Sequence, residues 1–243
     1  MKGILGIKLG MDQLFLANGQ VVPVSIIYVD DNYILQIKKN NDSKHNYNAI
    51  VLATIHKRES LMTNPLKQRF LKQKLKPCYY IKEVRTDLVS NYHVNQVLRA
   101  DVFKANEFVD VTSISKGKGF QGVIKRYNFH RGPMAHGSNY HRGIGSMGSI
   151  APNRIFKNKK MPGHMGAVKC TIQNLVVVHV DAKKNLLVIK GSVPGPRKGL
   201  VLIKSAIKKQ NTNLFSKFNF SLYQYQNLQA KNVTKTKVLK NGN

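Results

Sequence analysis

The chain has 243 residues, of which 40 are Lys or Arg and only 11 are Asp or Glu, so its formal net charge is +29. Such an excess of one sign repels itself in a compact fold, and we therefore expect an anionic partner: nucleic acid, a membrane surface or an acidic protein. The 42% apolar content excludes a purely disordered basic tail, and no apolar run approaches the length of a membrane-spanning helix.

The first part of the chain, residues 1–114, is predicted to be mostly β. Short β-branched runs separated by Gly, Asn or Asp are typical of strands. They occur at Ile4–Leu9, Val21–Val29, Tyr33–Ile37, Ala49–Ile55, Tyr79–Val84, Val94–Leu98 and Phe108–Val111. Residues 60–77 differ, because Pro65 is suited to a helix start and Leu66, Phe70 and Leu71 follow at helical spacing. We predict one small helical insertion there.

Residues 115–169 follow neither the strand nor the helix period. They contain ten Gly, three Pro, eleven Lys or Arg and four His. A structureless stretch of this length is improbable inside a compact domain unless it is functional. We therefore predict an extended irregular segment that is ordered by a partner.

Strand patterns return in residues 170–209, at CTIQNLVVVHV, NLLVIKG and GLVLIKSAI, with a basic loop PGPRKG at 194–199. Residues 210–243 are rich in Asn, Gln and Lys and are predicted to be a basic tail. The simplest fold that accounts for these segments is mainly β. We predict one barrel that is split by a helical insertion and by a long irregular basic extension.

The charge is concentrated in the second half. Residues 1–110 hold 16 basic and 10 acidic side chains, whereas residues 111–243 hold 24 basic side chains and the single acid Asp181. No carboxylate occurs from Val111 to Val180. Paired carboxylates for acid–base catalysis are therefore impossible in this region, and we predict that the chain is not an enzyme.

Three motifs resemble cofactor, metal or redox sites but lack the residues that such sites need. GKGFQG at 117–122 matches a dinucleotide fingerprint, but neither a long helix nor a ribose-binding acid follows it, so a glycine turn beside phosphate is favoured. The spacing of the four histidines matches no zinc pattern. Cys78 and Cys170 are too far apart for a CxxC site and are typical of a reducing compartment. No cofactor or metal is predicted.

The basic segment is best explained as an RNA interface. Its cations neutralise phosphates, its glycines let the backbone approach closely, and aromatics such as Phe120 and Phe156 stack on unpaired bases. The predicted RNA-binding residues are Lys116, Lys118, Lys125, Arg126, His130, Arg131, His136, His141, Arg142, Arg154, Lys157, Lys159, Lys160, His164, Lys169, Arg197 and Lys198.

These residues also resemble a known family. SKGKGFQGVIKRYNFHRGPMAHGSNYHR, GSMGSIAPNRIFKNKKMPGHMG and NLLVIKGSVPGPRKGLVLIKSAIK are similar to the bacterial form of the large-subunit ribosomal protein L three family, as is the start MKGILGIKLGMDQLF. The resemblance covers residues 1–209 and implies a six-stranded translation-protein-type barrel. It further implies an extension through large-subunit rRNA toward the peptidyl transferase centre, a role early in subunit assembly and neighbouring ribosomal proteins as partners.

Three hypotheses follow from the sequence. The leading one is a structural rRNA-binding protein in the ribosome of a bacterial cytoplasm, with a plastid or mitochondrial ribosome as the alternative location. A second is an RNA-modifying enzyme, which lacks a recognisable catalytic group. A third is a module for a membrane surface or an acidic partner, for which 65–76 is the only amphipathic candidate. Neither a small-molecule substrate nor a membrane partner is expected.

Overall fold

A computed structural model describes residues 2–15, 19–40 and 46–209. The predicted tail, 210–243, lies outside the described residues. The chain divides into two compact units, one made of Met1–Ser113 with Thr171–Asn243 and the other of Ile114–Cys170. The second unit corresponds closely to the irregular basic segment predicted at 115–169.

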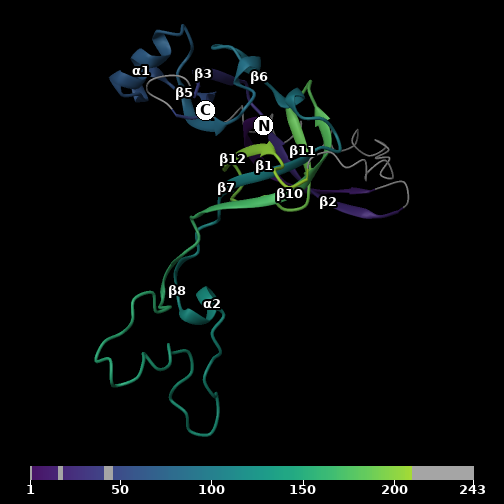
Figure 1. The fold of residues 1–243 in the computed structure, drawn as a ribbon. Helices are drawn as coiled ribbons and strands as arrows, with labels where there is room; N and C mark the ends of the chain where they lie inside the picture. Colours follow the sequence, from purple (N-terminus) through teal and green to yellow (C-terminus); the bar gives the residue numbers. More distant parts are fainter. Residues whose placement is uncertain (1, 16–18, 41–45, 210–243) are drawn as a thin grey trace. The chain divides into compact units, whose positions relative to one another are not determined.

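The first unit contains a closed six-stranded barrel (Figure 1). Its strands, in spatial order, are β1 (Gly3–Phe15), β12 (Leu200–Ser205), β7 (Phe108–Ile114), β10 (Lys169–Asp181), β11 (Leu186–Lys190) and β2 (Val21–Tyr28). The two ends of the described chain close the barrel, since Gly3 pairs with Lys204 and Ile7 with Leu200. The predicted mainly β fold with a six-stranded barrel is confirmed.

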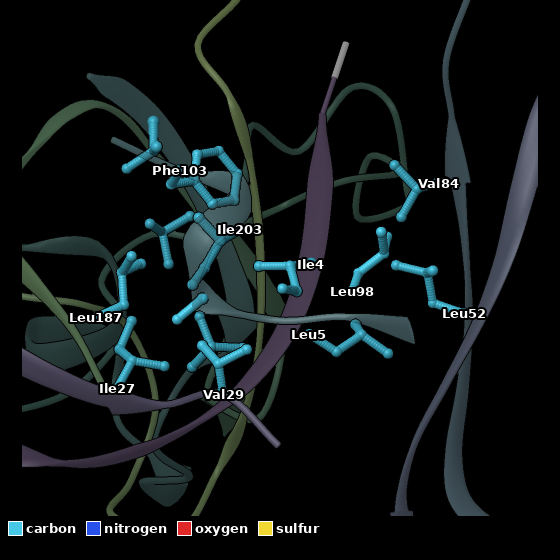
Figure 2. Packing of buried hydrophobic residues seen from close by; sticks show 14 of the residues in the cluster. Ile4, Leu5, Ile27, Val29, Leu52, Val84, Leu98, Phe103, Leu187 and Ile203 are labelled. Carbon is cyan, nitrogen blue, oxygen red and sulfur yellow. The ribbon is translucent and has the colours of Figure 1, made fainter. Parts of the chain in front are cut away.

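Alternation along the strands fills the barrel with branched apolar side chains. Ile4, Ile27, Leu187 and Ile203 are fully buried and belong to one continuous cluster. Figure 2 shows these side chains turned toward one another. Burial of such residues is the main favourable term in folding, at about 25 cal/mol per Å² of apolar surface.

A second sheet joins the barrel within the first unit. Its strands, in spatial order, are β5 (Cys78–Arg85), β4 (Ala49–His56), β3 (Asn32–Lys38) and β6 (Val97–Leu98). Leu52, Val84 and Leu98 belong to the same buried cluster as Leu5 of β1 (Figure 2). Gly3 is required at this junction, because a Cβ there would lie 2.6 Å from a methyl group of Val84.

The helix α1 (Asn64–Leu71) covers the other face of this sheet through Phe70, which is fully buried with Leu35 and Cys78. Pro65 lies in its first turn, as predicted. The helix ends earlier than the predicted 60–77 stretch, because Lys74 adopts a left-handed φ of 55°. The insertion into the barrel is thus larger than predicted: it is a four-stranded sheet with a helix, because β3–β6 pair with one another and not with the barrel.

One buried polar side chain marks the point where the chain leaves the barrel. The Oδ1 atom of Asn32 accepts a hydrogen bond from the amide of Leu5 at 3.0 Å, and its Nδ2 donates to the carbonyl of Leu5 at 3.0 Å. The side chain thereby imitates a strand partner and satisfies buried backbone groups of β1. The short 3₁₀ turns are Glu59–Leu61, Val89–Asn91 and Ala100–Val102. No helix among the described residues is long and apolar enough to cross a membrane.

The second unit has little regular structure, as predicted. It contains β8 (Gly119–Gln121), α2 (Val123–Tyr127) and β9 (Gly163–Met165), and the remainder consists of turns and extended backbone. The name "arm" is used below for residues 115–169.

Candidate nucleic-acid interface

The base of the arm is a narrow two-stranded ribbon. The amide of Ser115 donates to the carbonyl of Val168 at 2.9 Å, and β8 pairs with β9 so that Phe120 lies opposite His164. Gly166 has a φ of +79°, and a Cβ there would lie 2.2 Å from the carbonyl oxygen of Lys116. Only glycine permits this approach. The ribbon therefore fixes the spacing of the two limbs that carry the cations.

Arg126 joins the two limbs above the ribbon. Its guanidinium donates to the carbonyl of Met161 at 2.7 Å and lies 5.0 Å from the ring centroid of Tyr127. A Cβ on Gly163 would lie 2.6 Å from the same guanidinium, so glycine makes room for it. Although Arg126 is one of the predicted RNA ligands, the structure places it half-buried and occupied within the arm. We assign it a positioning role.

A tight loop between residues 132 and 143 is organised by Tyr140. The amide of Gly132 donates to the carbonyl of His141 at 2.8 Å, and the Nδ1 of His141 lies 2.9 Å from the carbonyl oxygen of Pro133. A Cβ at Gly132 would lie 2.1 Å from the carbonyl oxygen of Tyr140, and one at Gly143 would lie 2.3 Å from its ring. Both glycines are thus needed for close packing, and His141 has a structural partner.

The far part of the arm contains a shallow hollow of about 350 Å³. It is formed by backbone and side chains of Met147, Gly148, Ser149, Ile150, Asn153, Arg154 and Ile155. Ile150 is 91% exposed, which is unusual for an apolar side chain in a folded protein. Apolar and cationic groups placed together in this way suit the face of a base and its phosphate.

Most of the predicted RNA-binding side chains lie on the surface. All except Arg126 and His141 are exposed, namely Lys116, Lys118, Lys125, His130, Arg131, His136, Arg142, Arg154, Lys157, Lys159, Lys160, His164, Lys169, Arg197 and Lys198. Arg197 and Lys198 belong to the first unit and the others to the second. No carboxylate exists in the second unit to compete with an external anion for these cations.

Aromatic side chains are exposed among the same cations. Phe120 is 77% exposed, Phe156 60% and Tyr140 46%. Rings left in water beside Lys and Arg provide stacking surfaces that tolerate any base. The arm can therefore bind both the phosphates and the unpaired bases of a folded RNA.

The basic loop at 194–199 in the first unit is held in place by Lys8, a residue that no sequence motif indicates. Lys8 is buried, and its Nζ donates to the carbonyls of Val193 at 2.6 Å and Gly195 at 3.3 Å. The amide of Lys198 also donates to the carbonyl of Lys8 at 2.7 Å. Lys8 thus holds the loop that carries Arg197 and Lys198. The only sequence signal was a lone cation inside an apolar strand.

A second cluster of surface cations follows α1 and was not among the predicted ligands. Lys72, Lys74 and Lys76 are exposed, whereas Lys67 is paired with Glu59 at 3.1 Å. In the sequence these lysines belong to the basic run LKQRFLKQKLK, whose pattern predicts an amphipathic helix.

Three alternative chemistries suggested by the sequence can be compared with the described residues. No group of three His, Cys, Asp or Glu side chains there could hold a metal ion. The glycine turn of GKGFQG does lead into a helix, but α2 has five residues and ends at Tyr127, because the next residue, Asn128, is left-handed with a φ of 57°. Cys78 is buried, and burial followed by the charge of Asp30 raises the pKa of its thiol to about 11, which opposes nucleophilic chemistry.

Barrel and arm together define a class: a mainly β protein that carries a long, acid-free cationic segment suited to a polyanion. A family model described as ribosomal protein L3 matches residues 30–185. The chain is 51% identical to the large ribosomal subunit protein uL3 of Spiroplasma kunkelii over 214 residues, covering 87% of this chain and 81% of the relative. It is 52% identical to the uL3 of Geobacillus kaustophilus over 208 residues, covering 85% and 96%.

A third relative, the uL3 of an Exiguobacterium species, is 52% identical over 207 residues, covering 85% of this chain and 98% of the relative. The chain belongs to the ribosomal protein L3 family, a family of structural ribosomal proteins and not of enzymes. The resemblance predicted from the sequence motifs is confirmed.

Proposed function

We propose that this protein is a structural component of the large ribosomal subunit and that its arm binds large-subunit rRNA. The observation that carries the proposal is the arm itself: ten of its eleven Lys and Arg side chains are exposed, and none has a carboxylate within the same unit. Neutralising so many phosphates gives high affinity, with a strong dependence on salt.

The arm recognises RNA by shape. It has no helix long enough to enter a groove, since α2 has five residues. Its exposed rings and its ribbon of cations are suited to splayed bases and to phosphates that lie close together in folded RNA. By resemblance to its family, the arm extends through the rRNA toward the peptidyl transferase centre, and the protein joins the subunit early in assembly beside other ribosomal proteins.

The location follows from this role. The relatives named above are bacterial proteins. We propose that the chain functions in the ribosomes of a bacterial cytoplasm, the alternative being a plastid or mitochondrial ribosome.

Sedimentation tests the proposal. Tagged full-length chain, expressed in place of the native protein, should remain with the large subunit through a sucrose gradient at high salt. A matched chain in which Arg131, Arg142 and Arg154 are changed to Gln should be under-represented in mature subunits and enriched in lighter precursors. Sedimentation of the unaltered chain free of rRNA would refute the proposal.

A further inference from the structure

The turn that follows α1 presents a row of lysines to solvent. Lys72, Lys74 and Lys76 are exposed. Gln73 and Leu75, which alternate with them, are half-buried, and Leu75 packs against the cluster that joins α1 to the second sheet. We call residues 72–76 the lysine turn. Because of this alternation, no apolar side chain is exposed between its three cations.

The backbone of the lysine turn is held by hydrogen bonds on both sides. The amide of Lys74 donates to the carbonyl of Leu71 at 3.0 Å, and the Nδ2 of Asn95 donates to the carbonyl of Gln73 at 3.1 Å. Lys74 itself has a left-handed φ of 55°, a conformation that Gly or Asn adopts with less strain. The three cations are therefore presented on a preformed turn, so that less ordering is required when a ligand binds.

The charge of the lysine turn is not neutralised within the described residues. No Asp or Glu occurs from residue 60 to residue 82. The two acids that flank this stretch are each paired with another lysine, Glu59 with Lys67 at 3.1 Å and Glu83 with Lys38 at 2.6 Å. None of the salt bridges among the described residues includes a cation of the lysine turn. These cations are therefore available to an external anion.

An exposed aromatic ring and a further cation lie beside the lysine turn, where β5 begins next to α1 (Figure 1). The amide of Lys57 donates to the carbonyl of Pro77 at 2.9 Å, which brings the exposed Arg58 to this end of the sheet. The Nζ of Lys57 lies 5.1 Å from the ring centroid of Tyr79, and Tyr79 is 57% exposed. Tyr79 follows Lys76 by three residues, so their Cα atoms are at most about 11 Å apart. A ring beside available cations suits a base and its neighbouring phosphates.

We propose that the lysine turn is a second RNA-binding site, separate from the arm, which binds the phosphates of a short unpaired stretch of rRNA while Tyr79 stacks on one of its bases. A row of cations without apolar side chains between them favours RNA over an acidic protein segment, which would also need apolar contacts. The inference rests on the proposed function, because the ligand is the rRNA that the arm binds. The lysine turn belongs to the first unit and the arm to the second, so two linked sites raise the avidity for one RNA.

Site-specific photo-cross-linking in assembled subunits locates the ligand. Full-length chains carrying benzoylphenylalanine in place of Tyr79, or in place of Phe156 on the arm, are incorporated into large subunits in cells, purified and irradiated. The position of Phe156 should form adducts with rRNA, which checks the proposed function independently. The position of Tyr79 should form adducts with a different set of rRNA nucleotides, mapped by reverse transcription.

A charge variant supplies the second readout, in equilibrium binding of the full chain to large-subunit rRNA. It combines Lys72→Gln, Lys74→Asn and Lys76→Gln, since Asn suits the left-handed conformation of Lys74. At about 0.7 per phosphate of unpaired RNA, the magnitude of the slope of log K against log salt should fall by about 2. The matched control removes the same charge from exposed positions of the same unit through Lys104→Gln, Lys183→Gln and Lys184→Gln, and its slope should change by less than one. Unaltered thermal unfolding of both variants shows that folding is preserved.

Several results would overturn the inference while leaving the proposed function in place. They are adducts of the Tyr79 position with protein only, no adduct there in subunits where Phe156 reaches rRNA, adducts of both positions on the same nucleotides, or a slope that falls no more in the lysine-turn variant than in the control. If Phe156 also fails to reach rRNA, the proposed function fails as well.

Discussion

Changing Lys157, Lys159 and Lys160 together to Gln tests whether the arm binds phosphate. All three side chains are exposed, and the stretch from Val111 to Val180 contains no carboxylate that could pair with them. Each neutralised phosphate contributes about 0.7–0.9 to the slope of log K against log salt. If each lysine contacts one phosphate, the triple variant should reduce the magnitude of that slope by about 2–3.

The assay is equilibrium binding of the full chain to large-subunit rRNA over a salt series from about 50 to 200 mM. The matched control changes Lys104, Lys183 and Lys184 to Gln, because these three lysines are also exposed but belong to the first unit. In the control variant, the magnitude of the slope of log K against log salt should fall by less than one. Equal losses in both variants would mean that binding depends on net charge alone, and an unchanged slope in the arm variant would refute the assigned interface.

Three further predictions concern stability, the arm and the cysteines. Phe70→Ala should lower the free energy of unfolding by about 3–5 kcal/mol, measured by denaturant titration, because its fully buried ring joins α1 to the second sheet. The neighbouring Leu71→Ala, at a 53% exposed side chain, should change it by under about 0.5 kcal/mol, and equal effects would contradict this packing. Gly166→Ala should remove hydrogen-exchange protection of the Lys118 amide, which donates to the carbonyl of Met165 at 2.9 Å. Gly122→Ala is the control and should leave this protection unchanged, because an added Cβ there meets open space. Retained protection in Gly166→Ala would contradict the close approach of Gly166 to Lys116. At pH 8 a thiol reagent should label the exposed Cys170 quickly. Cys78 should react only after unfolding, or as the pH rises toward the raised pKa of its thiol, about 11. Rapid labelling of both cysteines would contradict the burial of Cys78.

Local patterns in the sequence were sufficient to predict the strands, but not which strands pair with one another. The alternation in Val21–Val29 and in Tyr33–Ile37 predicts two strands, and both exist. β3 nevertheless leaves the barrel, because Ile34 and Leu35 are buried on opposite faces, one against the barrel cluster and the other against α1. A strand covered on both faces and a barrel strand look alike in sequence. Pairing is decided by contacts distant in the chain, such as the side chain of Asn32 with Leu5.

The candidate site was predictable as a region and less so residue by residue. Composition located the arm, because the absence of acids and the density of Gly and Lys need no structure to be seen. It did not separate Arg126, which bonds to a carbonyl 35 positions away, from exposed Arg131 and Arg142. Composition also gave no role to Lys8, whose partners lie at the other end of the chain. Such roles depend on long-range geometry that a single sequence does not encode in any local pattern.

A cryo-electron microscopy map of large subunits purified with this chain would test the central claim most directly. We expect residues 115–169 to lie against rRNA, with Lys157, Lys159 and Lys160 at phosphates, Phe120 and Phe156 against bases, and the hollow around Ile150 near the peptidyl transferase centre. A map in which the chain is present but the arm contacts solvent or protein, and not rRNA, would contradict it.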